Sequence, residues 1–142
     1  MGSDVGQKKK VAKERGVLLL VDDDANVRAA LRRVFEPHGY RVLMAEHGED
    51  ALKIMNEHAI DVLVTDMRMP TMDGSELLRE VTLRWPDTVR ILLTGYSDLQ
   101  VTTQAIRSGH VDHFLTKPWD LAQIEKCVAD ALRTRAKRQS PT

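Results

Sequence analysis

The stretch Asp61-Val-Leu-Val-Thr-Asp-Met-Arg-Met-Pro-Thr-Met-Asp-Gly74 decides how this chain folds. Its first half is an apolar run of strand length that ends on a carboxylate, Asp66. Its second half contains Pro70 and the pair Asp73-Gly74, through which neither a helix nor a strand would continue. The sequence therefore predicts that Asp66 is presented at the C-terminal tip of a strand.

Two other apolar runs end on charged residues in the same way. The run Val17–Val21 is followed by Asp22, Asp23 and Asp24, and the run Val111–Thr116 is followed by Lys117 and Pro118. In an open parallel sheet, ligands bind outside the carboxyl ends of the strands. These strand ends are thus the first place to look for a site.

The same alternation of short apolar runs and helical patterns extends from Val17 to Leu132, as in an α/β protein with helices on both faces of a parallel sheet. Five strands are predicted over residues 17–21, 41–45, 61–65, 89–93 and 111–116. Five helices are predicted over residues 26–36, 48–58, 74–84, 98–108 and 120–137.

The helix predicted over 98–108 has the weakest signal. Its predicted apolar face consists of Leu99, Val101, Ala105 and Ile106. The adjacent β-branched residues Thr102 and Thr103 lower its helix propensity. Since switching elements come from the less stable parts of a fold, this helix is the candidate mobile element.

Length and composition bound the class of protein. At 142 residues, with 42% hydrophobic and 30% charged residues, the chain can bury a core as one domain. No apolar stretch has the length of a membrane span or of a signal peptide, so we expect a cytoplasmic protein without membrane contact. A single cysteine excludes an internal disulfide.

The formal net charge of zero hides basic ends, with +3 over residues 1–16 and +4 over residues 133–142. We expect a disordered leader over 1–16, the folded domain over 17–135, and a flexible tail or the start of a linker over 136–142. Because the body between the ends is acidic, no direct binding of nucleic acid is expected.

Five polar side chains follow the predicted strands: Asp22, Asp23, Asp66, Thr94 and Lys117. If the first strand is central and the third and fifth flank it, these side chains converge in one crevice. Two carboxylates about 4 Å apart repel by about 4 kcal/mol at an effective dielectric of 20, so the cluster calls for positive charge. Lys117 supplies one charge, and a hard divalent cation, Mg2+ or Mn2+, supplies the rest.

Such a site suits phosphoryl transfer, which needs mainly alignment and neutralisation of the phosphoryl oxygens. A carboxylate can attack phosphorus and form an aspartyl phosphate. Asp66 is the predicted nucleophile because it projects alone. Asp23, helped by Asp22, would hold the metal, and Lys117 and the Thr94 hydroxyl would bind phosphoryl oxygens.

With these motifs the chain resembles the response-regulator receiver domain of two-component signalling, over residues 17 to about 135. Four segments carry the resemblance: residues 17–24, 61–74, Ile91-Leu-Leu-Thr-Gly-Tyr96 and Phe114-Leu-Thr-Lys-Pro-Trp119. The resemblance implies a doubly wound, flavodoxin-like sheet with strand order 2-1-3-4-5. It also implies that the chain is a signalling domain, not an enzyme in the ordinary sense.

The family's roles carry over by position. Asp66 is implied as the phosphoacceptor, and Asp22, Asp23, Asp66 and the backbone carbonyl of Arg68 as metal ligands. Thr94 and Phe114 are implied as switch residues, and a cis peptide bond is implied between Lys117 and Pro118. Arg68 and Tyr96 flank the path of a hydrolytic water, and neither is an acid or amide that could orient it, so slow loss of the phosphoryl group is expected.

The resemblance also implies partners. The phosphoryl donor would be a sensor histidine kinase or a phosphotransfer protein, and the surface formed by residues 98–108, 111–116 and 120–137 would carry the response, including homodimer formation. The 94–98 and 116–119 motifs resemble receivers joined to larger outputs, either transcriptional or cyclic-di-nucleotide phosphodiesterase. We expect that output domain to lie outside this chain.

Other classes fit the residues less well. A haloacid dehalogenase-type phosphatase needs a second aspartate two positions after the nucleophile, where this chain has Arg68. A dinucleotide-binding domain needs a glycine-rich loop after the first strand, where three aspartates stand, and a P-loop is also absent. The remaining alternative is a receiver-like module that signals by protein contact without phosphorylation.

Overall fold

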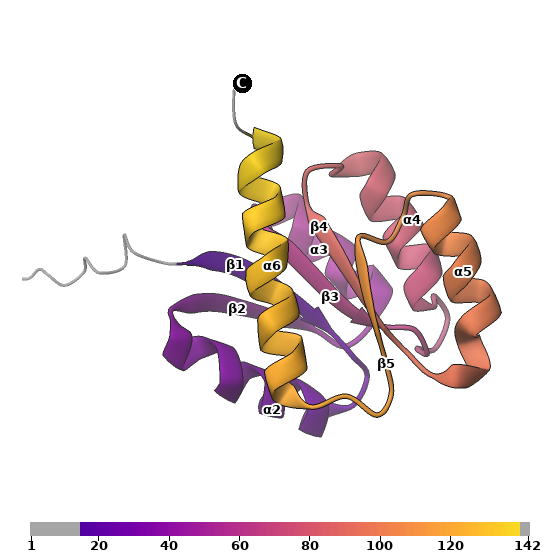
Figure 1. Ribbon diagram of the computed structural model, residues 1–142, viewed down its shortest axis with the longest axis horizontal. Coiled ribbons are helices and arrows are strands. Elements are labelled where there is room, and N and C mark those ends of the chain that lie inside the picture. The colour runs from indigo at the N-terminus through magenta and orange to yellow at the C-terminus, as the bar shows by residue number, and fades with distance from the viewer. Residues whose placement is uncertain (1–14, 140–142) are drawn as a thin grey trace, which may run out of the picture.

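The computed structural model describes residues 15–139, with side chains through residue 136. The parts of the predicted leader and tail over residues 1–14 and 140–142 lie outside the described residues. Its sheet consists of β1 (Gly16–Val21), β2 (Tyr40–Ala45), β3 (Val62–Asp66), β4 (Val89–Thr94) and β5 (His113–Thr116) (Figure 1). All strand pairs are parallel, in the order β2-β1-β3-β4-β5. The predicted fold class and strand order are confirmed.

The expectation that the fifth strand flanks the first was wrong. β5 does not flank β1, because β1 pairs with β2 and β3, and β5 pairs with β4 at the edge of the sheet. Each strand of a twisted parallel sheet has two neighbours at most, and β2 already occupies the second side of β1. Lys117 therefore approaches the site from the sheet edge.

Five α-helices connect and follow the strands within a residue or two of the predicted bounds. They are α2 (Ala25–Phe35), α3 (Gly48–Glu57), α4 (Gly74–Arg84), α5 (Leu99–Arg107) and α6 (Leu121–Gln139). Two 3-10 turns, η1 (Glu36–His38) and η2 (Tyr96–Asp98), end α2 and precede α5. Gly39 follows η1 with φ of 91°, a conformation that favours glycine and explains why the helix stops there. Gly16 and residues 136–139, which we had assigned to the leader and tail, belong to β1 and α6.

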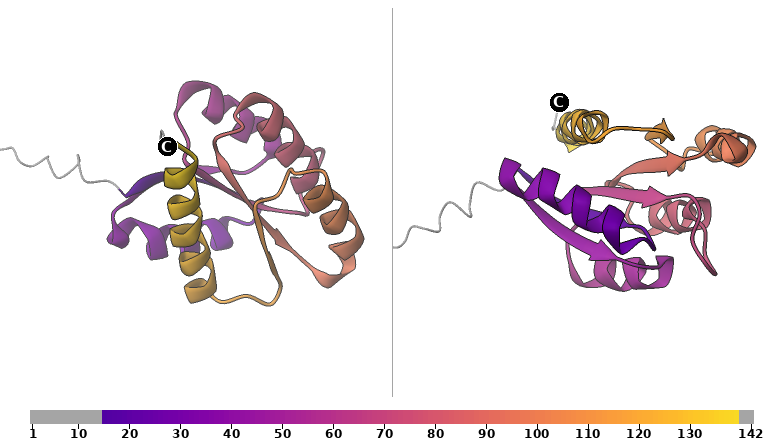
Figure 2. Two further views of the ribbon diagram at one scale, coloured as in Figure 1. Left: turned by 45° about the horizontal axis from the view of Figure 1, so that its top comes forward. Right: turned by 90° about the horizontal axis from the view of Figure 1, so that it is seen from below.

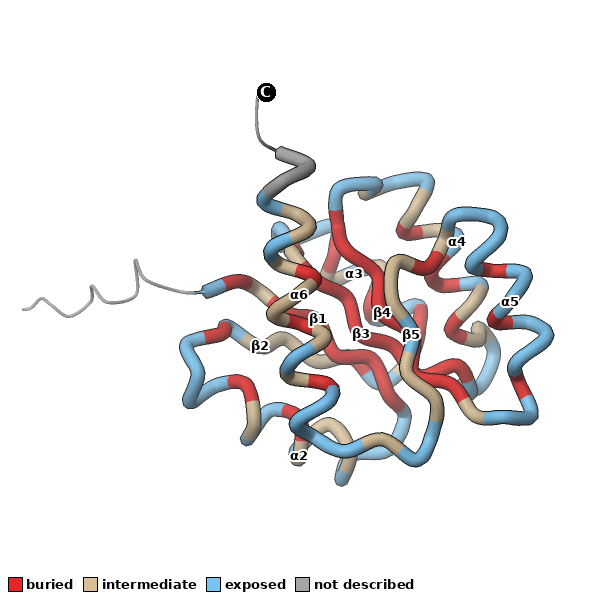
Figure 3. Tube along the Cα trace, in the orientation of Figure 1, coloured by how far each residue is buried: buried red, intermediate tan, exposed pale blue. Residues whose placement is uncertain are grey.

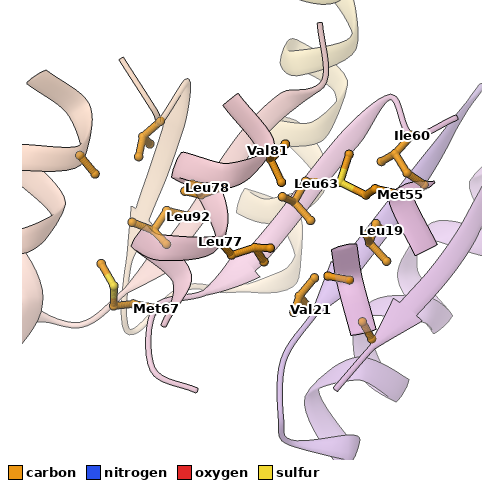
Figure 4. Packing of buried hydrophobic residues seen from close by; sticks show 14 residues of the cluster. Leu19, Val21, Met55, Ile60, Leu63, Met67, Leu77, Leu78, Val81 and Leu92 are labelled. Carbon is orange, nitrogen blue, oxygen red and sulfur yellow. The ribbon is translucent and has the colours of Figure 1, made fainter. Parts of the chain in front are cut away.

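Alternate residues of the strands point to opposite faces of the sheet, and each face has its own core. In Figure 1, α6 crosses in front of the sheet and α2 lies along its lower edge, and Figure 2 shows α3 and α6 on opposite sides of the strands. On the α3–α4–α5 face, Leu19 and Leu63 pack with helix residues such as Leu78 (Figure 4). On the α2–α6 face, Leu18 packs with residues such as Phe35 and Ile124. The sheet is thus a rigid platform between two apolar layers.

Burial falls from the centre of the sheet to its edge. All residues of β3 and β4 are buried, whereas β5 has no fully buried residue (Figure 3). β5 begins at His113, two residues later than predicted, because Asp112 turns its carboxylate to Arg90 on β4. The strand beside the phosphoryl-binding candidates is therefore the least enclosed one.

The predicted apolar face of α5 is confirmed at Ala105 and wrong at its other three residues. Leu99, Val101 and Ile106 are about two-fifths exposed, at 39%, 41% and 39%. The buried residues are Asp98, Thr102 and Ala105. Their i, i+4, i+7 spacing defines one helical stripe, whereas the positions of the apolar residues do not all repeat on one side. α5 thus turns a largely polar stripe toward the protein, and this stripe adjoins the site.

The N-terminal ends of the strands carry paired charges. Asp112, before β5, accepts from the Arg90 backbone N–H at 2.9 Å and lies 3.5 Å from the Arg90 guanidinium. Asp61, before β3, accepts from the Val17 N–H at 2.7 Å and lies 2.8 Å from the Arg135 guanidinium.

Across residues 15–139, no helix is long and apolar enough to span a membrane.

Candidate functional site

The acid cluster forms because β1 and β3 are neighbours that end at the same level. Val21 pairs with Thr65, so Asp22 follows one strand next to Asp66 at the tip of the other. Both residues are 6% exposed, whereas Asp23 is exposed. Carboxylate oxygens of Asp22, Asp23 and Asp66 all lie within 4.8 Å of one another. The predicted convergence of these three groups is present.

The loop after β1 is held by its own hydrogen bonds. Asp22 Oδ1 accepts from the Asp24 N–H at 2.8 Å, and the Arg28 guanidinium donates to the Asp22 carbonyl at 2.6 Å. Asp24 caps α2 by accepting from the Asn26 N–H, which is the structural role expected for an aspartate at a helix start. Of the three consecutive aspartates, two are left for the site.

Burial and crowding change the proton affinity of the cluster. Burial raises the pKa of Asp22 to about 6, and the neighbouring carboxylates of Asp66 and Asp23 add to the rise. Burial also raises the pKa of Asp66, while the Lys117 ammonium opposes the rise. Charged carboxylates held this way favour a proton or a cation between them.

Lys117 reaches the cluster from the end of β5. Its Nζ lies 3.2 Å from Asp66 Oδ1, and its backbone N–H donates to the Thr94 carbonyl at 2.8 Å. The Lys117–Pro118 peptide bond is cis. The lysine thus pairs with one carboxylate oxygen of Asp66 while its backbone is fixed to β4.

The loop from Asp66 to Gly74 closes tightly over the tip of β3. Met67 donates to the Leu93 carbonyl at 2.9 Å, and Gly74 donates back to the Met67 carbonyl at 2.8 Å. A Cβ on Gly74 would lie 2.4 Å from the Asp66 carbonyl oxygen, so no side chain fits. Asp73 and Glu76 form a capping box that starts α4. Asp66 is therefore positioned by backbone contacts on both sides.

An open cleft of ≈ 500 Å³ lies beside this loop and is lined by residues that include Asp23, Arg68 and Asp98. The Arg68 guanidinium crosses it and pairs with Asp98 at 2.8 Å. Its Nη2 is also 3.5 Å from the Ser97 hydroxyl. The sequence did not reveal Asp98 as a site residue, and its only signal was the i, i+4 spacing with Thr102 on α5.

The switch candidates lie on β4 and β5. Thr94, at the end of β4, is fully buried, and its hydroxyl is 3.0 Å from that of Thr102 and 3.4 Å from the Gly95 carbonyl. Phe114 is 43% exposed on β5, and Tyr96 is 68% exposed on η2. The structure thus brings Asp22, Asp23, Asp66 and Lys117 together, while Phe114 and Tyr96 are exposed on β5 and η2.

Comparison with known proteins assigns the chain to a family. The family model of the response regulator receiver domain matches residues 18–129. The chain belongs to the response regulator receiver domain family. Receiver domains bind Mg2+ at an acidic pocket, and this chain has an acid cluster of Asp22, Asp23 and Asp66.

The relatives of this receiver domain are regulators and other receivers. The DNA-binding transcriptional regulator NtrC of Proteus hauseri is 37% identical over 119 residues, which cover 81% of this chain and 25% of that protein. Among solved structures, the signal receiver domain of an HD domain-containing protein from Pseudomonas fluorescens Pf-5 has a TM-score of 0.84 at 29% identity, covering 92% of this chain and 96% of that one. A response regulator receiver domain protein from Clostridium thermocellum has a TM-score of 0.82 at 28% identity, covering 87% and 99%. The chain spans about a quarter of the length of the regulators it matches.

Proposed function

We propose that this receiver domain accepts a phosphoryl group on Asp66 from a sensor histidine kinase or a phosphotransfer protein. The observation that carries the proposal is the placement of the Asp66 carboxylate at a strand tip, 3.2 Å from Lys117 and beside Asp22 and Asp23. One oxygen of Asp66 would pair with the lysine, which leaves the other for attack on phosphorus. No second function has a comparable observation behind it.

The transfer step follows from these positions. An Asp66 oxygen forms a bond to phosphorus as the bond from phosphorus to the donor nitrogen breaks, and the donor imidazole leaves with the electron pair and takes up a proton. Lys117 would neutralise one phosphoryl oxygen, and the Thr94 hydroxyl would donate to another once it turns toward Asp66. Little covalent work remains for the protein, because positioning and charge neutralisation dominate phosphoryl transfer.

The residues present fit a divalent cation. Asp22, Asp23 and Asp66 offer hard oxygen ligands within 4.8 Å of one another, and the backbone carbonyl of Arg68 would complete the protein's share. Mg2+, or Mn2+ in its place, would supply the charge neutralisation that the phosphoryl oxygens need, and it keeps several waters in such sites. Asp23, the exposed carboxylate, would bind the cation directly, and Asp22 would assist.

The conformational change would be transmitted from the site through Thr94 and Phe114. As the Thr94 hydroxyl moves to the phosphoryl group, it vacates space into which the half-exposed Phe114 ring can turn. Most large exposed apolar side chains of the described residues lie on η2, α5 and β5: Tyr96, Leu99, Val101, Ile106 and Phe114. The α5–β5–α6 surface is thus the proposed contact for an output partner or a second copy of the chain.

The type of output domain is inferred by analogy with the relatives of this chain. The matched regulator from Proteus hauseri is described as a DNA-binding transcriptional regulator, and the Pseudomonas receiver comes from an HD domain-containing protein. We propose that this receiver likewise controls an output domain, and the sequence relatives favour a transcriptional one. Direct nucleic-acid binding by the receiver domain is not part of the proposal.

Labelling with acetyl phosphate or phosphoramidate tests the assignment of Asp66. Intact-mass measurement should show one added phosphoryl group on the wild type in Mg2+, and none after chelation or in Asp66→Asn. Asp24→Asn is the matched control, because Asp24 lies in the same acidic loop but caps α2, and asparagine caps equally well. This variant should label like the wild type.

The same measurement tests the alternative, in which the chain signals without phosphorylation. A wild-type chain that takes up no phosphoryl group in Mg2+ would leave the interaction module as the function. Labelling of Asp66→Asn at the wild-type rate would move the phosphoacceptor to another residue.

A further inference from the structure

The buried hydroxyl of Thr102 has one hydrogen-bond partner among residues 15–136, and that partner is the switch candidate Thr94. Thr102 is 1% exposed and Thr94 is fully buried, and their hydroxyl oxygens lie 3.0 Å apart. The contact joins the end of β4 to the second turn of α5. Thr94 has the Gly95 carbonyl as a second neighbour, at 3.4 Å, whereas the Thr102 side chain has no second hydrogen bond among residues 15–136.

The next residue shows that the arrangement at Thr102 is not general for this helix. The Thr103 hydroxyl donates to the Leu99 carbonyl at 2.8 Å, which is the usual backbone acceptor for a threonine inside a helix. Thr103 is exposed, and its hydroxyl bonds within the helix. Two adjacent threonines on α5 thus differ in burial and in whether the hydroxyl is bonded inside the helix or to β4.

We propose that Thr102 is a positioning residue that holds the Thr94 hydroxyl away from Asp66 in the unphosphorylated protein and couples its release to a rearrangement of α5. The inference rests on the proposed function, because it assumes that a phosphoryl group on Asp66 recruits Thr94. When Thr94 leaves, the Thr102 hydroxyl stays buried without a partner, and a buried unsatisfied hydroxyl is unfavourable. α5 must then shift until Thr102 finds water or a backbone acceptor.

This arrangement explains how the change would reach the exposed side of α5. Thr102 and Ala105 form the inward stripe of the helix, and Leu99, Val101 and Ile106 are exposed on it. A rotation that satisfies the Thr102 hydroxyl therefore also changes how those apolar side chains are presented. The Thr102 hydrogen bond has a second effect, because it favours the unphosphorylated conformation and so opposes activation.

Removing the hydroxyl should therefore favour activation. Thr102→Val keeps the shape and removes the hydroxyl, so it weakens the resting conformation and removes the unsatisfied group from the activated one. We expect Thr102→Val to bind beryllium fluoride, a phosphoryl mimic, about five- to tenfold more tightly than the wild type in the presence of Mg2+. Without the mimic, the amide resonances of α5 should already be displaced toward the positions that the wild type shows when bound.

Matched variants separate this role from a general effect of the substitution. Thr103→Val makes the same chemical change on the same helix and should leave the affinity unchanged. Thr102→Ser keeps the hydroxyl and should behave like the wild type. In a Thr94→Val background, Thr102→Val should no longer raise the affinity, because the partner that it releases is gone.

The outcomes are distinguishable. Wild-type protein that binds beryllium fluoride, with Thr102→Val binding no more tightly, overturns the role of Thr102 and leaves the proposed function standing. Wild-type protein that binds none overturns the proposed function and this inference together. If Thr102→Val does not fold, Thr102→Ala gives the same comparison, because alanine also lacks the hydroxyl and suits a helix.

Discussion

At the N-terminal end of the sheet, two partly buried carboxylates are each paired with an arginine, whereas at the C-terminal end three carboxylates face one another beside Lys117. Asp61 and Asp112 both accept a backbone N–H as well as the guanidinium of Arg135 or Arg90. Burial raises the pKa of Asp22 and Asp66, which lie at the other end of the same sheet. The same residue type is thus neutralised inside the chain at one end and left to be neutralised by a ligand at the other.

The difference separates residues that fold the chain from residues that do its chemistry. Arg90 is 5% exposed and also donates to the Thr88 and His110 carbonyls at 3.0 Å each, so its loss would leave several buried groups without partners. The acid cluster, by contrast, is locally unfavourable because its carboxylates are crowded and partly buried. The two apolar layers of the fold offset this cost. The following changes should act on stability at one end and on phosphorylation at the other.

The largest effect is expected at the N-terminal end. Arg90→Met should lower the free energy of unfolding by about 3 to 5 kcal/mol, because it breaks a buried ion pair and strips the carbonyls that Arg90 satisfies. Urea unfolding measures the change. Arg41→Met is the matched control, since Arg41 is an exposed strand residue, and its effect should stay within about 0.5 kcal/mol. A loss at Arg90 no larger than the control would mean that the pairing at this end is incidental.

At the C-terminal end, Lys117→Gln should leave the fold intact and slow phosphorylation of Asp66 by about a hundredfold or more, as expected when one fixed positive donor is removed from a charged transition state. The initial rate of labelling by phosphoramidate reports the change. Lys126→Gln, on the exposed face of α6, should label at the wild-type rate. A Lys117→Gln rate within a few-fold of the wild type would show that the 3.2 Å pair with Asp66 is structural.

The pH dependence of stability sharpens the comparison further. Burial raises the folded-state pKa of Asp22 from 3.8 to about 6, so the folded protein holds a proton that the unfolded chain has lost between those values. Stability of the metal-free protein should therefore fall as the pH rises from about 4 to about 6. Asp22→Asn removes the effect and should make the protein more stable than the wild type at pH 7 by on the order of 2 kcal/mol.

Urea unfolding in a chelator, at several pH values, measures this difference. The counterpart at the other end, Asp61→Asn, should destabilise the protein at pH 7, since Asp61 pairs with Arg135. Equal signs for the two asparagine variants would contradict the distinction between the two ends.

The smallest effect is expected at Arg68 and Tyr96. Arg68 pairs with Asp98, and Tyr96 is largely exposed. We propose that both flank the approach of water to a phosphorylated Asp66 without orienting it. Arg68→Asn and Tyr96→Ala should each speed loss of the phosphoryl group by between about two- and tenfold, below about 1.4 kcal/mol on the barrier. Decay of the labelled protein after removal of the donor gives the rates. Unchanged or slower loss in Tyr96→Ala would exclude screening by the ring.

The positions that follow from backbone geometry could be predicted from the sequence. The side-chain contacts between different helices and strands could not. Asp22, Asp66 and Lys117 could be placed because each directly follows an apolar run, and parallel strands end at a common edge. Asp98 and Thr102 could not be placed, because hydropathy assigns exposed apolar residues such as Leu99 to the core and polar residues to solvent. Their burial depends on partners 30 and 8 positions away, Arg68 and Thr94, which only tertiary packing brings close.

The close approach of Gly74 to the backbone of Asp66 has a consequence for tolerance to mutation. Because a Cβ at position 74 would overlap the Asp66 carbonyl, all nineteen other side chains start from the same clash, whatever their chemistry. A saturation scan should therefore show position 74 as uniformly intolerant, unlike Asp24, where any good capping residue suffices. A glycine eight residues after an aspartate at a strand end is then a marker by which chains with this loop can be recognised, even when the rest of the sequence has diverged.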